Sequence, residues 1–422
     1  MRTASVLQVL LGVERTVVED AQYALDRDGD LGLIVHVRPR KGARQRCGRC
    51  GRRAGWYDQA GRRRRWRSLD AGTTKVWLEA TVPRVACPEH GPTVVQVPWA
   101  RHDAGHTYAF DDQVAWLAVR TSRTAVAELM RVAWRTVGAI CRRVAEDAKQ
   151  KVNRLANLRR IGIDEISYKR NHHYLTVVVD HDTRLLVWAA PGRDKEMLGQ
   201  FFDLLGEDSG KRITHVLAGG ADWIKTVVKQ RCPGALLGAD PYHVVSWATD
   251  ALDAERRDVW NSARAGKGKA TDESKALKKA RWVLWRNEDD LTEAQQAKLG
   301  WIEKTHPRLH RAWALKEGLR WVFSLARQGF PRLATTALDR WLSWARRCRI
   351  PAFVKLAGKV ARHRDAIEVS LQHGLNNGLV ESTNTKARLL ARQAFGFRDP
   401  HALIGLAMLA LGGLCPPLPG RV

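Results

Sequence analysis

The sequence predicts a multidomain α/β protein, in which one α/β domain is interrupted by an all-helical insertion and preceded by two small modules. Strand-like alternation begins near residue 158 and then gives way to alternating strand and helix patterns. Farther along, a long stretch is rich in helix formers and tryptophan without a convincing strand, and two cysteine-containing pairs lie near the N-terminus. The expected domain ranges are 1–105, 106–155, 156–250, 251–360 and 361–422, the last completing the α/β domain.

The charge of the chain points to a polyanionic partner. Lys and Arg total 71 against 44 Asp and Glu, a net charge of +27 at pH 7. No uninterrupted apolar run approaches the roughly 20 residues that span a bilayer, and no signal peptide is recognisable. Seven cysteines, an odd number spread over the chain, do not resemble a secreted disulfide framework. We therefore expect a cytoplasmic protein that binds nucleic acid and has no membrane partner.

Two short pairs predict a zinc site in residues 1–105. Cys47 and Cys50 form C-x-x-C, and Cys87 and His90 form C-x-x-H, with strand-like sequence between them. A gap of two residues lets a tight turn present both ligands of a pair to one tetrahedral Zn²⁺, so a zinc ribbon is expected. Alternatively, Cys87 is a buried thiol and His90 a loop residue, or another nearby histidine, His102 or His106, supplies the fourth ligand.

The same region is densely basic. Residues 38–67 carry thirteen Lys or Arg and one acid, with Trp56 and Trp66 among them. Such a run is usually a solvated face, but its density on a metal-pinned scaffold favours contact with DNA phosphates. The residues expected to make that contact are Arg62, Arg63, Arg64 and Arg65.

Residues 106–155 show helical periodicity with two breaks, near Thr121 and near Val132. The stretch "TAVAELMRVAWRTVGAICRRV" fits helix, tight turn, second helix, a pattern that many helical hairpins share with DNA-binding helix-turn-helix domains. After the basic zinc region, the DNA-binding interpretation is favoured. Thr136, Arg142 and Arg143 would then face DNA from the second helix.

The α/β domain predicts a carboxylate pair. Three strands in succession, then helix, strand, helix and a short fifth strand, are the order of a ribonuclease-H-like fold. In that fold an acid on the first strand faces an acid that follows the fourth, which selects Asp164 and Asp222. With one carboxylate from a late helix, such a pair can bind two divalent ions about 3.5–4 Å apart.

Other acids of this domain have competing explanations. Glu165 should point to the opposite face of the strand from Asp164, and Asp180 and Asp182 are expected in a turn. Asp240 and His243 form D-x-x-H after the fifth strand. They either support the metal ligands from behind and handle protons, or Asp240 simply caps a helix.

The late helix carries the third acid. In "GLVESTNTKARLLARQAFGF", Glu381, Thr385, Arg388 and Arg392 share one helical face, which suits a metal ion beside a phosphate backbone. A plain N-terminal helix carboxylate followed by solvated arginines is the alternative. Lys386, Arg388 and Arg392 are the expected DNA contacts of this segment.

The sequence between Asp222 and Glu381 is far longer than the fold needs, so residues 251–360 are expected to be a helical insertion. Most of its tryptophans should be core residues. In "KKARWVLWRNEDD", however, Trp282, Trp285 and Arg286 lie beside lysines and could stack an unpaired base while holding its phosphate.

These motifs together resemble a known family. The chain resembles the DDE transposases of bacterial insertion sequences, within them the ISL-three family, through "IGIDEIS", "ADW", "DPYHVV" and above all "GLVESTNTKARLLARQAFGFRD". Two departures from the family pattern are C-x-x-H in place of C-x-x-C and the glycine-rich "LAGGADW" before Asp222. The resemblance implies a zinc head, a helix-turn-helix and a catalytic domain that cleaves DNA at terminal inverted repeats and transfers the strands into target DNA.

The resemblance also implies the cofactors and the assembly. Mg²⁺ or Mn²⁺ would be held by Asp164, Asp222 and Glu381, beside the Zn²⁺ of the head, and the protein would act on the bacterial nucleoid as a homodimer when paired ends are bound. A structure-specific ribonuclease-H-like nuclease is the alternative enzyme. A catalytically dead, zinc-dependent DNA-binding regulator is the alternative outside enzymes.

Overall fold

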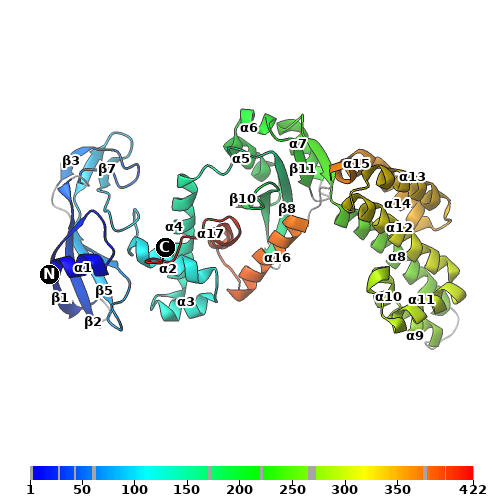
Figure 1. Cartoon of the computed structure of the whole chain (residues 1–422), viewed down its shortest axis with the longest axis horizontal. Helices are drawn as coiled ribbons and strands as arrows, with labels where there is room; N and C mark the ends of the chain where they lie inside the picture. Colours follow the sequence, from blue (N-terminus) through cyan, green and yellow to red (C-terminus); the bar gives the residue numbers. More distant parts are fainter. Residues whose placement is uncertain are drawn as a thin grey trace. The chain divides into compact units, whose positions relative to one another are not determined.

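The computed structural model describes residues 3–26, 29–41, 44–58, 63–169, 173–218, 222–264, 272–373, 378–394 and 396–421. The chain divides into two compact units, residues 1–152 with 390–422, and residues 153–389 (Figure 1). In the described residues, no helix combines the length and the apolarity that a membrane crossing needs.

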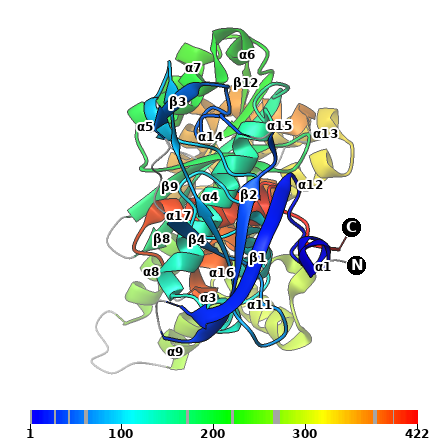
Figure 2. The ribbon, with the colours of Figure 1, turned by 90° about the vertical axis from the view of Figure 1, so that its left-hand side faces the viewer.

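The N-terminal head of the first unit consists of two small sheets. The larger sheet has the order β1-β2-β5-β4 and the smaller one the order β3-β6-β7. Alternating burial, as in β2, places one face of the larger sheet on a core around Trp66 and Leu78. Figure 2 shows α1 (Thr3–Leu10) beside the edge strand β1. The strands are β1 (Thr16–Leu25), β2 (Leu31–Pro39), β3 (Gly55–Asp58), β4 (Arg63–Arg67), β5 (Val76–Thr81), β6 (Arg84–Cys87) and β7 (Gly91–Val94).

Four helices complete the first unit. Thr107 and Ser122 cap α2 and α3 by accepting backbone N–H bonds, and α4 follows a tight turn. The C-terminal α17 packs against α4, where Gly405 lies so close that an added Cβ would be 2.8 Å from Arg142 Cα. The four helices are α2 (Tyr108–Ala118), α3 (Arg123–Leu129), α4 (Trp134–Lys151) and α17 (Pro400–Leu411).

This packing differs from the predicted domain boundary. The sequence assigned all of residues 361–422 to the α/β domain, whereas residues 390–422 group with the N-terminal unit. The reason is that α17 is apolar on nearly every side and buries that surface between α4 and α2.

The second unit is built on one five-stranded sheet with the order β10-β9-β8-β11-β12. The first three strands in the chain, β8, β9 and β10, are antiparallel neighbours, while β11 and β12 run parallel to β8. Helices α5 and α7 cover one face through a core around Phe201 and Ile224. The strands are β8 (Arg160–Lys169), β9 (His173–Asp180), β10 (Leu186–Pro191), β11 (His215–Ala218) and β12 (Leu236–Ala239).

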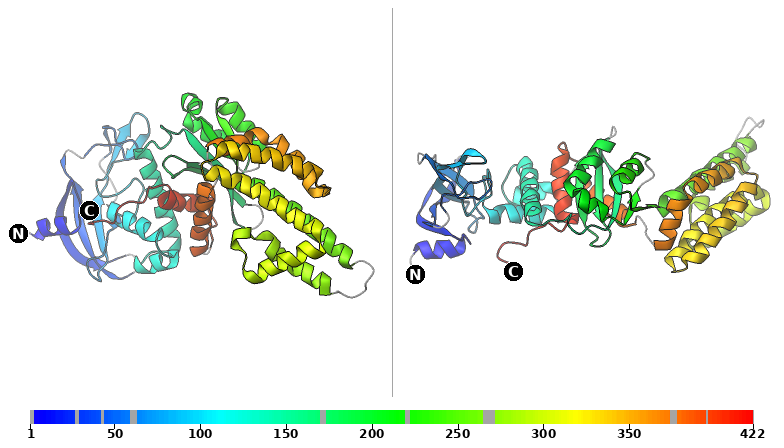
Figure 3. Two further views of the ribbon diagram at one scale, coloured as in Figure 1. Left: turned by 45° about the vertical axis from the view of Figure 1, so that its right-hand side comes forward. Right: turned by 90° about the horizontal axis from the view of Figure 1, so that it is seen from above.

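Helices fill the stretch between β12 and the last helix of this unit. Their buried side chains form one continuous core, and Figure 3 shows α8, α12 and α13 side by side. The helices of the unit are α5 (Lys195–Leu205), α6 (Glu207–Lys211), α7 (Asp222–Arg231), α8 (Pro241–Arg264), α9 (Asp272–Lys279), α10 (Arg281–Trp285), the 3-10 helix η2 (Glu288–Asp290), α11 (Glu293–Thr305), α12 (Pro307–Arg327), α13 (Pro331–Arg347), α14 (Pro351–Arg362), α15 (Arg364–His373) and α16 (Gly378–Gln393).

Two local features concern the end of the sheet and the tryptophans, and the expectation for the tryptophans needs correction. The fifth strand ends at Ala239, and the stretch after Asp240 is helical, because Pro241 lacks an N–H and suits the first turn of α8. The tryptophans of the helical stretch are less uniformly buried than expected. Trp313 and Trp341 are core residues, and the exposed ones are Trp282, Trp285, Trp321 and Trp344.

Candidate functional site

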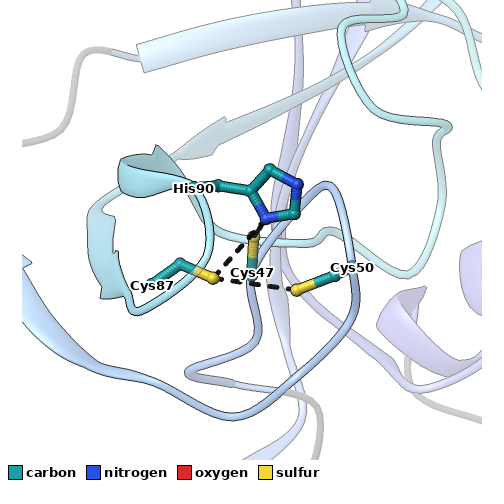
Figure 4. Close-up of side chains that lie close together, drawn as sticks. All are labelled: Cys47, Cys50, Cys87 and His90. Carbon is teal, nitrogen blue, oxygen red and sulfur yellow. Dashed lines mark hydrogen bonds between the residues drawn. The ribbon is translucent and has the colours of Figure 1, made fainter.

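The four predicted zinc ligands converge in the head (Figure 4). Cys50 Sγ lies 3.7 Å from Cys87 Sγ, and His90 Nδ1 lies 3.6 Å from Cys87 Sγ and 3.9 Å from Cys47 Sγ. In a tetrahedral site with Zn–S bonds of about 2.3 Å, ligand atoms stand about 3.8 Å apart. The donor set and its spacing therefore fit Zn²⁺, including the histidine that replaces a cysteine.

Matching turns present the two pairs. Each pair is followed by a glycine with positive φ, Gly51 at 68° and Gly91 at 65°, a conformation that other residues adopt only with strain. Burial of the Cys47 thiol opposes ionisation, but N–H bonds from the backbone of Cys50 and Arg49 hold its pKa below the usual range. Thiolates are the form that binds metal.

The alternative ligands do not join the cluster. His102 lies against Gly48, where an added Cβ would be 2.6 Å from His102 Nδ1. His106 stacks on Phe110 with ring centroids 5.0 Å apart, and burial lowers its pKa to about 4. Neither histidine belongs to the group of converging ligand atoms, so His90 is the fourth member.

The basic strand β4 is partly neutralised within the fold. Glu79 on the neighbouring β5 accepts from Arg65 Nε at 2.7 Å and from Arg63 Nη1 at 3.1 Å. The Arg64 guanidinium lies over the Trp66 ring. Arg62 is outside the described residues. A role for these arginines in DNA contact stays a prediction.

The second helix of the predicted hairpin presents a mixed face. Arg142 is exposed and lies 3.6 Å from Asp399, and Thr136 is partly exposed in the first turn of α4. Arg143 instead donates to both oxygens of the buried Asp111 at 2.8 and 2.9 Å. Its guanidinium is thus engaged in joining α4 to α2, and its contact with DNA stays a prediction.

Sequence reasoning missed two side chains on α4. Trp134 and Arg135, at the start of the helix, are both exposed, and the Arg123 guanidinium lies 4.2 Å from the centroid of the Trp134 ring. The N-terminal turn of a recognition helix is the part that usually meets base edges. The position of Trp134 and Arg135 directly after the predicted turn was the sequence signal that could have identified them.

Half-buried carboxylates gather beside the sheet of the second unit. Asp164 on β8 accepts from Asn384 Nδ2 on α16 at 2.6 Å, and Glu381 lies one turn earlier on the same helix. Burial, together with the negative charge of Asp240, raises the pKa values of Asp164 and Glu381. The hydrogen bond with Asp240, assisted by the charges of Asp164 and Glu381, raises the pKa of His243.

Asp240 makes a helix-cap contact and also binds His243, while its support of metal ligands stays a prediction. Its Oδ1 accepts from the backbone N–H of Tyr242 at 3.2 Å, as a helix cap does, and its Oδ2 lies 2.5 Å from His243 Nδ1. The charges of Asp240 and His243 act on Glu381, and those of Asp164 and Glu381 act on His243, so the D-x-x-H element lies near both acids.

The third predicted acid is only partly described. Asp222 begins α7, but its side chain lies outside the described part, as do residues 219–221. β11 ends at Ala218, which pairs with Ile163, one residue short of Asp164. Its proximity to Asp164 stays a prediction. Glu165 accepts from Trp223 Nε1 of α7 at 3.1 Å.

The outer face of α16 is cationic. Thr385, Lys386, Arg388 and Arg392 are exposed, while Glu381 is half-buried. One helical face therefore has Glu381 at its half-buried end, near the other acids, and Thr385, Arg388 and Arg392 at its exposed end.

The aromatic pair predicted to meet a base lies at the surface. The Trp282 side chain is 67% exposed, and the Arg281 guanidinium lies 3.9 Å from the centroid of the Trp285 ring. Arg286 is exposed and donates to the Asp290 carbonyl at 3.2 Å.

Comparison with known families decides the identity of the chain. A family model of ISL3 type, described as transposase, matches residues 161–406, more than half of the chain. The chain belongs to the ISL3 family of transposases. The ISL3 helix-turn-helix model matches residues 95–145, and the zinc-finger model of the transposases of IS204, IS1001, IS1096 and IS1165 matches residues 43–90. The order predicted from the sequence, zinc ribbon, helix-turn-helix and transposase domain, is confirmed.

Two relatives extend the ISL3 assignment. The chain is 60% identical over 440 residues to the transposase for insertion sequence element IS1557 of Mycobacterium tuberculosis, a match that covers 100% of this chain and 98% of the relative. It is 26% identical over 343 residues to the transposase for insertion sequence element IS1001 of Bordetella parapertussis, covering 80% and 81% of the two chains.

Proposed function

We propose that the second unit is a ribonuclease-H-like catalytic domain interrupted by a helical insertion. The proposal is supported by the order β10-β9-β8-β11-β12, with three antiparallel strands followed by two parallel ones. The helices from α8 to α15 are the insertion, and α16 returns to the sheet with the last carboxylate.

We propose that Asp164, Asp222 and Glu381 bind Mg²⁺ or Mn²⁺ during DNA strand cleavage and strand transfer. The half-buried Asp164 and Glu381, whose pKa values are raised by desolvation and by the charge of Asp240, supply oxygen donors that fit a hard divalent cation. When bound, a pair of such ions stabilises the charge that develops on the attacking and leaving oxygens of an in-line displacement. Strand β8 and helix α16 would fix the positions of Asp164 and Glu381 relative to the ions.

Asp240 and His243 have a supporting role in this proposal. Asp240 is almost fully buried, and its hydrogen bond fixes the ring of His243. A protonated His243 is a counter-charge for the neighbouring carboxylates, so it partly offsets their repulsion. Asp240 Oδ2 holds that proton on His243 Nδ1.

DNA recognition is proposed for the first unit. The zinc-bound head supplies phosphate contacts through β4, and α4 reads the terminal inverted repeats of the element. The cations of α16 and the Trp282 and Trp285 pair hold the strand near the acids. The enzyme would act in the bacterial cytoplasm, on the nucleoid, as a dimer that joins two ends.

The observation that carries the proposal is the juxtaposition of Asp164 and Glu381 beside Asp240 in a chain of the ISL3 family. Footprinting the full-length protein on the DNA that flanks its gene tests the recognition step. Protected inverted repeats at both ends support the transposase. Protection that follows branched structure and ignores sequence would instead support a nuclease, and specific protection with no cleavage in Mg²⁺ would support a regulator.

A further inference from the structure

Asn384 links β8 and α16, the elements that carry Asp164 and Glu381. It lies three residues after Glu381 on α16, its side chain is 3% exposed, and its Nδ2 donates to Asp164 Oδ2 at 2.6 Å. The neighbouring Thr383 is also buried, but its hydroxyl donates to the Leu379 carbonyl within the same helix. Of these two buried polar side chains, Asn384 is the one that reaches across to β8.

The chemistry of the pair favours this orientation of the amide. With the amide reversed, its oxygen would face a carboxylate oxygen at 2.6 Å, which is repulsive when Asp164 is ionised. As a donor, Asn384 binds Asp164 Oδ2 and leaves Oδ1 out of this hydrogen bond. Because the amide is neutral, it does this without bringing a positive charge that would repel a cation, as a lysine would.

The oxygen of the Asn384 amide provides a second observation. Asn384 Oδ1 is buried, and among the described residues nothing donates a hydrogen bond to it. An unsatisfied buried acceptor is costly and uncommon. An amide oxygen in this place, next to carboxylates, can accept from water at a cation or coordinate the cation itself.

We propose that Asn384 is a positioning residue for divalent metal: it holds the Asp164 carboxylate in the orientation in which its second oxygen binds the ion. The inference rests on the proposed function and deepens it. Groups that hydrogen-bond a metal-binding carboxylate fix its direction, and their loss weakens metal binding by about 10–100-fold.

The test measures metal binding separately from catalysis. Zinc-loaded full-length protein without DNA is titrated with Mn²⁺, and free Mn²⁺ is followed by electron paramagnetic resonance. Asn384→Ala is compared with wild type, with Asp164→Asn as the variant that lacks the ligand. Thr383→Val is the matched control, because it removes a buried hydrogen bond from the same helix without touching Asp164.

Asn384→Ala should raise the dissociation constant for Mn²⁺ at least about tenfold, while Thr383→Val binds as wild type. The Mg²⁺ concentration for half-maximal cleavage should rise in parallel, and saturating Mg²⁺ should restore most of the rate. Wild-type Mn²⁺ binding in Asn384→Ala, or a lost rate with unchanged half-saturation, would overturn the inference. If the alanine variant does not fold, Asn384→Ser, whose hydroxyl is too short to reach Asp164, gives the same comparison.

The failure of the inference is distinguishable from failure of the proposed function. If Asp164→Asn binds Mn²⁺ as wild type does, the metal site itself is misassigned. If Asp164→Asn loses the ion while Asn384→Ala retains it, only the role of Asn384 is refuted.

Discussion

The close approach of α16 to β8 at Gly162 predicts the effect of one added methyl group. A Cβ at Gly162 would lie 2.9 Å from His181 Nε2 and closer still to Val380 Cγ2. Atoms in favourable contact are about 3.5–4.0 Å apart, so the Val380 contact must open by at least roughly 0.6 Å. Val380 is fully buried and precedes Glu381 on α16, while Asp164 follows Gly162 by two residues on β8. Gly162→Ala therefore pushes the two acids apart.

Two magnitudes follow for Gly162→Ala. Overpacking should cost about 1–3 kcal/mol of unfolding free energy, a drop of several degrees in thermal midpoint. A misplacement approaching 1 Å can reduce the rate about 10²-fold, so cleavage of end DNA in Mg²⁺ should fall much more than end binding. The assay is cleavage of a labelled end duplex, with binding measured by mobility shift on the same preparation.

A second-site change and a control sharpen this prediction. Val380→Ala removes the methyl that Gly162→Ala meets, so the double variant should recover part of the cleavage lost in Gly162→Ala alone. Gly358→Ala, in α14, where an added Cβ meets nothing within 4 Å, should leave both activities unchanged. The reasoning is refuted if Gly162→Ala cleaves at the wild-type rate with the wild-type thermal midpoint.

Three further predictions concern the head, the acid cluster and the insertion. Elemental analysis should find roughly one equivalent of zinc in the wild-type protein and less in Cys47→Ser, because a structural site needs all four ligands. Equal zinc in both proteins would contradict the assignment of the zinc site. Without divalent metal, the free energy of unfolding should fall as the pH rises from the ordinary carboxylate range through the raised pKa of Asp164, because the folded state binds the carboxyl proton more tightly than the unfolded state. Asp164→Asn should weaken this pH dependence in thermal scans. An unchanged profile in the variant would contradict the prediction. Trp282→Ala should reduce cleavage with little change in thermal midpoint, because the residue is 67% exposed. A large loss of stability would instead mark Trp282 as a core residue.

Patterns within single elements predicted the sheet well. Alternation along β8 and β9, and the succession of strand and helix after β10, gave the strand sequence that the structure has. The two zinc pairs were recognisable because their ligand spacing is set by local turns. Both kinds of signal depend on residues close together in the chain.

Contacts between distant segments were not predictable from those patterns. Asn384 and Asp164 are 220 residues apart, and an asparagine within a helix carries no periodic signal. The charge of Arg143 gave no indication that Asp111 would bind it. α17 is apolar all round, so its sequence could not show whether it packs on the sheet or on α4, where Gly405 permits close contact.

The most direct test of the catalytic assignment is strand cleavage and transfer by carboxamide variants on the protein's own inverted repeats. Asp164→Asn, Asp222→Asn and Glu381→Gln each remove a charge with little change in volume, so each should abolish cleavage and transfer in Mg²⁺ while end binding stays near wild type. Normal cleavage by Glu381→Gln or Asp222→Asn, with activity lost in Asp240→Asn, would contradict the account and assign the metal to the D-x-x-H element.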